Sequence, residues 1–262
     1  MLTEELVQNI IDISHQAGDK IMAIYQKDFG VYEKSDASPL TDADLAAHNC
    51  IVEGLNEVSD LPILSEESAD ISWQERNSWD TYWLVDPLDG TKEFIKKNGE
   101  FTVNIALIEN GVPVFGVVYA PVLTQTYVGI LGKGAFKITA GEKTEISPKA
   151  WTKGETWKVV GSRSHQSPEI QALLDSLEGE TELVAMGSSL KLCLVAEGAA
   201  HLYPRLGPTC EWDTGAAQAV VEAAGGKVTI IEDSADALKA DAAPLRYNQK
   251  ESVLNPYFLV SC

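Results

Sequence analysis

The stretch from residue 83 to residue 94 constrains this chain more than any other. An apolar run that is typical of a buried strand ends in two carboxylates three residues apart, Asp86 and Asp89, and a Gly-Thr pair follows. Pro87 fixes its own φ, and Gly90 permits backbone conformations that other residues resist. Both acids are therefore expected on one turn at the tip of a strand. Carboxylates and backbone carbonyls are the ligands that hard divalent cations prefer, so the segment indicates a Mg²⁺ site beside a hydroxyl that polarises a water.

The same stretch has a simpler interpretation. Asp-Pro-x-Asp-Gly is a favourable type I turn, with Asp first and Pro second. Asp89 or Thr91 is also a suitable cap for a following helix. The rest of the chain has to decide between a turn and a metal site.

Length and composition point to a large intracellular domain. The 262 residues and 45% hydrophobic content suffice for one large domain or two moderate ones. No apolar run approaches the ~20 residues that span a bilayer, and the N-terminus does not resemble a signal peptide, so we expect no stable membrane insertion. The four cysteines are widely spaced, which predicts neither a zinc site nor a disulfide framework and fits a reducing cytoplasm.

The net charge of −19 limits the partners of the chain. A field of that sign opposes binding to nucleic acid and to anionic membranes. It also opposes long-range capture of a phosphorylated substrate. Bound cations are usually the largest charges in such a site and reverse the sign locally.

Periodicity predicts helices and strands in both halves of the chain. Helical spacing of apolar residues covers 3–26, 41–58, 168–177, 188–197 and 212–224, and strand patterns cover 62–64, 81–85, 101–109, 112–119, 125–130, 157–161, 182–185, 200–203 and 227–231. The stretch 141–154 is charged and turn-rich, so we place a boundary near residue 150. An α+β subdomain over 1–150 and an α/β subdomain over 151–262 are expected.

Four acidic clusters lie at the ends of predicted elements: Thr41-Asp42-Ala43-Asp44, Glu66-Glu67, Asp86 with Asp89, and Asp213. Each has a purely structural alternative. Thr41 and Asp44 match a helix capping box, Asp213 is favourable charge near a helix N-terminus, and the glutamates suit a solvated loop. Convergence of several acids in a partly buried site, however, requires cations, because burying unpaired charge is costly.

The order of these motifs resembles the inositol monophosphatase superfamily. The resemblance rests on Ser65-Glu66-Glu67-Ser68, then Asp86-Pro87-Leu88-Asp89-Gly90-Thr91, then Trp212-Asp213 followed by small residues, and it covers essentially the whole chain. Members of this superfamily are Mg²⁺-dependent, lithium-sensitive phosphatases. The resemblance implies an α/β fold that is a layered αβαβα sandwich.

Further segments are similar to the CysQ branch of that superfamily. They are Ser38–His48, Lys92–Ile95, Gly161–His165, Gly187–Lys191 and Tyr203–Thr209. This branch comprises 3′(2′),5′-bisphosphate nucleotidases, which convert adenosine 3′,5′-bisphosphate to AMP and serve sulfur metabolism. Some members act on the sulfated nucleotide or on inositol 1,4-bisphosphate.

The resemblance also implies a set of metal ligands and a catalytic pair. The ligands are the carboxylates of Glu66, Asp86, Asp89 and Asp213 and the carbonyl of Leu88, holding two or three Mg²⁺. Glu67 is the second choice at its position. Asp44 accepts the proton of Thr91, which orients an attacking water, and Asp42 is an alternative partner of Thr91. In-line attack then needs no covalent intermediate.

The substrate-binding residues follow in the same way: Gly90, Thr91, Ser162, His165, Ser188, Lys191, Arg205 and Asp213. Lys191 follows a Gly-Ser-Ser turn at a predicted helix N-terminus, where backbone N–H groups bind phosphate. Arg205 and His165 are the other candidates for a second phosphate. Lys191 as a solvated lysine and His165 as a loop histidine remain alternatives. Ser162, Trp212 and Tyr247 are candidates for the base pocket.

Three functions compete at this stage. The leading one is a Mg²⁺-dependent 3′-phosphatase acting on a small nucleotide, as a monomer or homodimer. The second is the same chemistry on inositol phosphates or a sugar bisphosphate. The third is an inactive homologue that senses nucleotide or metal, which the intact set of acids and Thr91 disfavours.

Overall fold

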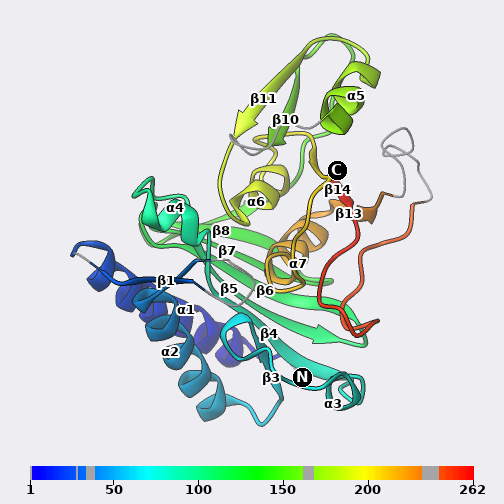
Figure 1. Ribbon diagram of the computed structural model, residues 1–262. Helices are drawn as coiled ribbons and strands as arrows, with labels where there is room; N and C mark the ends of the chain where they lie inside the picture. Colours follow the sequence, from blue (N-terminus) through cyan, green and yellow to red (C-terminus); the bar gives the residue numbers. More distant parts are fainter. Residues whose placement is uncertain (1, 28, 34–38, 162–167, 232–241) are drawn as a thin grey trace.

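The computed structural model describes residues 2–27, 29–33, 39–161, 168–231 and 242–262 (Figure 1). The helices are α1 (Glu4–Tyr25), α2 (Asp42–Val58), α3 (Trp73–Arg76), α4 (Thr91–Ile95), α5 (Pro168–Ser176), α6 (Leu190–Ala196) and α7 (Gly215–Ala224), with a 3₁₀ turn, η1, at Glu66–Ser68. The strands of the first half are β1 (Val31–Glu33), β2 (Pro39–Thr41), β3 (Ile63–Ser65), β4 (Thr81–Asp89), β5 (Thr102–Glu109), β6 (Val112–Ala120), β7 (Gln125–Ile130), β8 (Gly134–Thr139) and β9 (Glu142–Ile146). Those of the second half are β10 (Trp157–Gly161), β11 (Thr181–Ala185), β12 (Tyr203–Arg205), β13 (Lys227–Ile230) and β14 (Phe258–Ser261).

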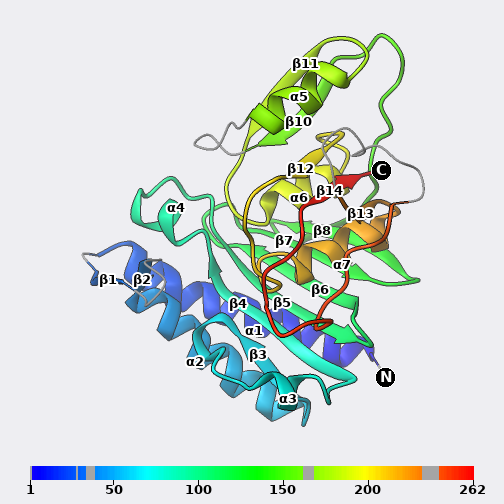
Figure 2. The same ribbon diagram turned by 45° about the vertical axis from the view of Figure 1, so that its right-hand side comes forward.

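A seven-stranded sheet forms the centre of the molecule. Its strands run in the order β3-β4-β5-β6-β7-β8-β9, and all neighbours are antiparallel except the parallel pair β3 and β4. Helices α1 and α2 cover one face of this sheet, and α6 and α7 lie on the other (Figures 1 and 2). The smaller strands β10–β14 and helix α5 lie beyond α6 and α7, which completes a layered α/β sandwich. The expected fold class is therefore confirmed.

The central strand β4 is apolar because both of its faces are buried. Trp83 and Val85 belong to the core under α1 and α2, whereas Tyr82 and Leu84 belong to the core under α6 and α7. Side chains alternate between the two faces of a strand, so a strand between two helical layers needs an unbroken apolar run. The same packing leaves the polar C-terminal end of β4 at the edge of both cores.

Helix α7 approaches the sheet closely over two glycines. A Cβ atom at Gly116 would lie 2.2 Å from the carbonyl oxygen of Ala216, and one at Gly129 would lie 2.4 Å from the Cα atom of Val220. Because no other residue fits beneath the helix, these glycines set its height above the sheet. They thereby fix the position of the turn that precedes α7, in which Asp213 lies.

Several element boundaries differ from the sequence-based expectations. Strand β4 continues to Asp89 rather than ending at residue 85, so the expected type I turn is wrong. Residues 142–146 form the edge strand β9 inside the stretch expected to be a turn-rich linker. Its side chains are charged and mostly exposed, which hides any alternation of apolar residues. Periodicity also missed β1, β2, α3, α4, β8 and β14, placed the strand at 203–205 three residues early, and began helix α7 at residue 212 instead of Gly215.

The division of the chain near residue 150 stays a prediction. The central sheet is built from residues 63–146, and α7 from the second half packs on it. The two expected subdomains therefore share one core on that face of the sheet.

Candidate active site

Three carboxylates from separate segments meet at one end of the central sheet. The carboxylate oxygens of Glu66, Asp86 and Asp213 lie within 4.8 Å of one another. Glu66 begins η1, Asp86 lies in β4, and Asp213 lies in the turn before α7. Asp213 is fixed there because its Oδ2 accepts a 2.8 Å bond from the backbone N–H of Cys210.

The parallel pairing of β3 and β4 brings the first two acids together. Ser65, the last residue of β3, is paired with Val85, so Glu66 and Asp86 both follow the same rung of the sheet. The ends of neighbouring parallel strands form one edge, and ligands bind at such edges. Two segments 20 residues apart in sequence thus place their acids side by side.

A bulge in β4 turns Asp86 and Asp89 to the same face. Asp86 pairs with Asn104 and Asp89 with Thr102, so three steps along β4 oppose two steps along β5. In a regular strand, residues three apart face opposite sides. The extra residue corrects this, as bulges near active sites commonly do. Leu88 N–H donates to Asp86 Oδ1 at 3.1 Å, while the Leu88 side chain is buried in the core.

Three aspartates at this site have raised pKa values. Burial, followed by the charge of Glu66, holds the pKa of Asp86 well above its ordinary value. Burial raises the pKa of Asp213 to about 7, with the charge of Asp89 adding to it. Burial also raises the pKa of Asp89 to about 6, although the nearby Lys191 ammonium opposes the shift. Repulsion and desolvation both disfavour the charged forms, and a bound cation relieves both.

The donor set fits a hard divalent cation. All three members of the cluster offer carboxylate oxygens, and the carbonyl of Leu88 lies on the same bulge. Oxygen-only ligation from acids and carbonyls suits Mg²⁺, Ca²⁺ or Mn²⁺ rather than zinc in a sulfur site. Glu66, Asp86 and Asp213 are therefore the residues that would hold the ion, with Asp89 adjacent.

Thr91 and Asp44 meet directly beside this cluster. Thr91 Oγ1 donates to Asp44 Oδ1 at 3.2 Å and lies 3.4 Å from the Leu88 carbonyl oxygen. The other oxygen of Asp44, Oδ2, accepts from Thr41 N–H at 2.7 Å and from Thr41 Oγ1 at 2.5 Å, which forms the capping box of α2. Capping and contact with Thr91 thus use different oxygens of one buried carboxylate. Asp42 instead accepts a bond from Gly30 N–H.

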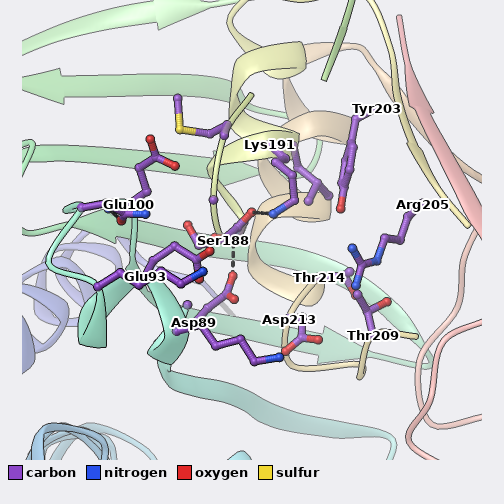
Figure 3. Close-up of a pocket in the computed structure, with 18 residues that line it drawn as sticks. Asp89, Glu93, Glu100, Ser188, Lys191, Tyr203, Arg205, Thr209, Asp213 and Thr214 are labelled. Carbon is purple, nitrogen blue, oxygen red and sulfur yellow. Dashed lines mark hydrogen bonds between the residues drawn. The ribbon is translucent and has the colours of Figure 1, made fainter. Parts of the chain in front are cut away.

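A cavity of about 290 Å³ opens next to the acidic cluster. Six of the predicted site residues line it, namely Asp89, Gly90, Ser188, Lys191, Arg205 and Asp213. Lys191 and Arg205 point into the space in which Asp89 and Asp213 lie (Figure 3). Gly90 has φ +96, and a Cβ there would lie 3.1 Å from the Glu100 carbonyl oxygen, so glycine suits this wall of the cavity.

The two cations of the cavity differ in their partners. Lys191 Nζ donates to the Ser188 carbonyl oxygen at 2.6 Å, and burial lowers the pKa of Lys191. Arg205 Nη2 donates to the Pro208 carbonyl oxygen at 2.7 Å and the guanidinium also hydrogen-bonds Tyr203, while its buried Nε–H has no partner among the described residues. A buried donor without an acceptor is costly, which makes Arg205 suited to receive an anion.

Some predicted residues fall elsewhere. Ser162 and His165 lie outside the described residues. Tyr247 is buried in the core, where its hydroxyl donates to Gln218 at 2.7 Å, and neither it nor Trp212 lines the cavity. Sequence reasoning missed several lining residues as site residues, namely Lys92, Glu93, Lys96, Glu100, Met186, Tyr203 and Thr209. The four-residue spacing of Lys92, in α4, and Lys96, which follows its last residue, was the available signal.

Comparison with known proteins decides the family. The model of the inositol monophosphatase family matches residues 3–256. The chain belongs to this family. The family is metal-dependent, and the acidic cluster is the part of this member that suits the metal.

Individual members of the family are similar over their full length. The Escherichia coli K12 protein named 3′(2′),5′-bisphosphate nucleotidase CysQ is 48% identical over 259 residues, which cover 98% of this chain and 99% of the relative. The Haemophilus influenzae protein of the same name is 35% identical, with 99% of this chain and 93% of the relative covered. The crystal structure of CysQ from Bacteroides thetaiotaomicron matches with a TM-score of 0.83 and 44% identity, covering 97% of this chain and 96% of that one.

More distantly similar structures share the fold. The suhB protein of Bartonella henselae matches with a TM-score of 0.76 at 22% identity, over 98% of this chain and 94% of that one. In the part of this chain that the structure describes, no helix is both long enough and apolar enough to cross a bilayer.

The raised pKa values predict how the metal-free protein responds to pH. The folded state binds more protons than the unfolded state between the ordinary and the raised pKa values, so stability falls as pH rises through that window. We expect the melting temperature of the EDTA-treated protein to be at least ~3 °C higher at about pH 5.5 than at about pH 8. Saturating Mg²⁺ at the higher pH should reduce the difference, because a cation replaces the protons of the cluster, whereas Glu211, whose pKa burial raises to about 7, lies outside it.

Two variants separate this effect from the general acidity of the chain. Asp213→Asn should lose a large part of the pH difference, whereas Asp60→Asn, a change of an exposed acid, should keep it. Differential scanning calorimetry measures both. Equal pH profiles for the two variants would contradict the assignment of the pH-dependent stability to the acidic cluster.

Proposed function

We propose that the protein is a Mg²⁺-dependent 3′(2′),5′-bisphosphate nucleotidase that converts adenosine 3′,5′-bisphosphate to AMP and phosphate. The observation that carries the proposal is that an acidic site and a cationic site lie next to each other. An acidic cluster suited to divalent cations adjoins a cavity that contains Lys191 and Arg205. A substrate with one phosphate to cleave and another to hold fits both parts. The name of the full-length relatives at 35–48% identity supports the same substrate.

The cations supply Lewis-acid activation of the phosphate and of the attacking water, and they screen the charge of the cleaved group. We propose two or three Mg²⁺, with Glu66, Asp86, Asp89 and Asp213 and the Leu88 carbonyl as ligands. The remaining steps belong to the protein's own side chains.

Thr91 is proposed to orient the attacking water. Its hydroxyl proton is directed at Asp44 Oδ1, so the lone pairs of Oγ1 face away from that carboxylate and accept a hydrogen bond from water. As the water attacks phosphorus, its proton passes to Thr91 and the Thr91 proton passes to Asp44. The bond from phosphorus to the 3′ oxygen breaks, and the ribose hydroxyl takes its proton from solvent.

The second phosphate is proposed to lie against Lys191, Arg205 and Ser188. The unpartnered Nε–H of Arg205 would gain an acceptor there, and the desolvated Lys191 ammonium would gain a counter-charge. Charge-assisted bonds of this kind are among the strongest in proteins. By their motif positions, Gly90, Ser162 and His165 are also proposed to contact the substrate.

The broader properties follow from the same proposal. We infer inhibition by Li⁺, a cytoplasmic location, action as a monomer or homodimer, and no nucleic-acid polymer as a partner. Each of these rests on the resemblance, the charge of −19 and the chemistry of the site.

A substrate panel tests the proposed function. Adenosine 3′,5′-bisphosphate, inositol 1-phosphate and fructose 1,6-bisphosphate are assayed side by side for phosphate release with Mg²⁺. We expect kcat/KM for the nucleotide to exceed that for inositol 1-phosphate by at least ~30-fold, because bonds from two cations to a second phosphate contribute about 2–3 kcal/mol. Equal or better turnover of inositol 1-phosphate would overturn the nucleotidase assignment.

An arginine variant links that preference to the cavity. Arg205→Ala should raise KM for the nucleotide and leave inositol 1-phosphate nearly unaffected. Arg246→Ala removes an exposed arginine outside the cavity and serves as the matched control.

The role of Thr91 is tested by removing its hydroxyl without changing its shape. Thr91→Val should lower kcat by about 10²–10⁴ with little change in KM, because general-base assistance of this size is lost. Thr91→Ser keeps the hydroxyl and should retain most of the activity. Steady-state kinetics with saturating Mg²⁺ measure both, and a Thr91→Val enzyme within threefold of wild type, roughly, would exclude the proposed role.

A further inference from the structure

A buried chain of hydrogen bonds runs from the central sheet to Asp89. Thr102 Oγ1 lies 2.8 Å from Ser189 Oγ, Ser189 Oγ donates to Asn104 Oδ1 at 2.9 Å, and Asn104 Nδ2 lies 3.5 Å from Asp89 Oδ2. The backbone N–H of Ser189 donates to the same Asp89 oxygen at 2.5 Å. Thr102, Asn104 and Ser189 are at most 1% exposed. None of the three belongs to the proposed metal ligands, catalytic pair or substrate-binding residues.

The bonds can run in only one direction. The Asn104 carbonyl oxygen accepts from Ser189, so its amide nitrogen faces the Asp89 carboxylate, which only accepts. The Ser189 proton is used on Asn104, so Ser189 Oγ must accept the proton of Thr102. Each donor in the series therefore has one acceptor, and the series ends on a carboxylate. Buried hydrogen-bond networks with a fixed direction favour a single geometry.

These hydrogen bonds occupy one carboxylate oxygen of Asp89. Among the described residues, both hydrogen bonds to Asp89 end on Oδ2, and this leaves Oδ1 to face a cation. Carboxylate ligands are commonly oriented by hydrogen bonds of this kind, and their loss weakens metal binding. The register of the sheet supports the arrangement, because Thr102 and Asn104 pair with Asp89 and Asp86 across β4 and β5.

The same series of hydrogen bonds holds the turn that forms one wall of the cavity. Ser189 follows Ser188, whose φ of +47 is uncommon for a residue other than glycine. Lys191 Nζ binds the Ser188 carbonyl oxygen, and Ser189 is fixed to β5 on the opposite side. Ser189 thus connects Asp89 to the turn that lines the cavity.

We propose that Thr102, Asn104 and Ser189 are positioning residues that hold the Asp89 carboxylate in its metal-binding orientation and lock the 187–191 turn onto the sheet. The inference rests on the proposed role of Asp89 as a metal ligand. A purely structural network would affect the stability of the fold and leave the affinity for cations unchanged, which gives the two interpretations different measurable outcomes.

The test compares isosteric changes at two buried threonines. Thr102→Val removes the first donor of the chain, and Thr102→Ser keeps it. Thr126→Val is the matched control, since Thr126 is also a buried strand threonine with one side-chain bond, 2.7 Å to His15 of α1, and it lies two strands away from β5 with its side chain on the α1 face of the sheet. Binding of Mn²⁺ to the metal-free full-length protein is followed by loss of the free-ion electron paramagnetic resonance signal, and calorimetry gives the melting temperature of each variant.

We expect Thr102→Val to raise the Mn²⁺ dissociation constant by about tenfold, as for other residues that orient metal ligands. Thr102→Ser should restore the wild-type value, and Ser189→Ala should reproduce the Thr102→Val effect. Thr126→Val should lower the melting temperature without weakening Mn²⁺ binding. If Thr102→Val and Ser189→Ala bind Mn²⁺ as tightly as Thr126→Val, the proposal is overturned.

Asp89→Asn separates this inference from the function on which it rests. If Asp89→Asn weakens Mn²⁺ binding while Thr102→Val does not, only the positioning role fails. If Asp89→Asn binds Mn²⁺ normally, Asp89 is no ligand, and the positioning role falls together with that part of the proposed site.

Discussion

Repulsion among clustered carboxylates is the constraint on which the rest of the structure depends. Glu66, Asp86 and Asp213 place oxygens within 4.8 Å of one another, and burial with mutual repulsion raises the pKa values of Asp86 and Asp213. Such an arrangement is unfavourable in a metal-free protein near neutral pH. The fold has to hold the acids together against this repulsion. It does so at the end of the apolar strand β4, both faces of which are buried.

Each acid is held by a different backbone device, and these devices connect the two halves of the chain. Parallel pairing of β3 and β4 aligns Glu66 with Asp86, and a bulge in β4 turns Asp89 to the same face. Helix α7 packs closely on two glycines of the sheet, which fixes the turn that carries Asp213. The same geometry places the cationic cavity next to the acids. In the proposed function, bound cations would reverse the sign of the field on one side of the site, and Lys191 with Arg205 would attract the second phosphate on the other side, so that an acidic protein could hold a doubly phosphorylated ligand.

The sequence was sufficient for the fold class and for the acids that the structure brings together, because the motifs that carry them resemble those of the inositol monophosphatase family. It was insufficient where geometry depends on pairing. The expected turn at Asp86–Asp89 is a bulged strand, and β9 escaped notice because an exposed edge strand carries charges on both faces. Asn104 stands inside the apolar run of β5, and a polar residue in a buried strand was an available signal, but its partner Ser189 is 85 residues away. Only the folded chain reveals that contact.

The central claim is that this acidic cluster is a divalent-cation centre, and locating an ion tests it most directly. Crystals of the protein grown with saturating Mn²⁺ would be measured at the manganese absorption edge, where anomalous scattering identifies the ion. The account predicts a strong anomalous peak between Glu66, Asp86 and Asp213, and it predicts that Asp89 Oδ1 contacts a bound ion. Saturating Mn²⁺ with no peak at these acids, or with ions bound only elsewhere, would contradict it.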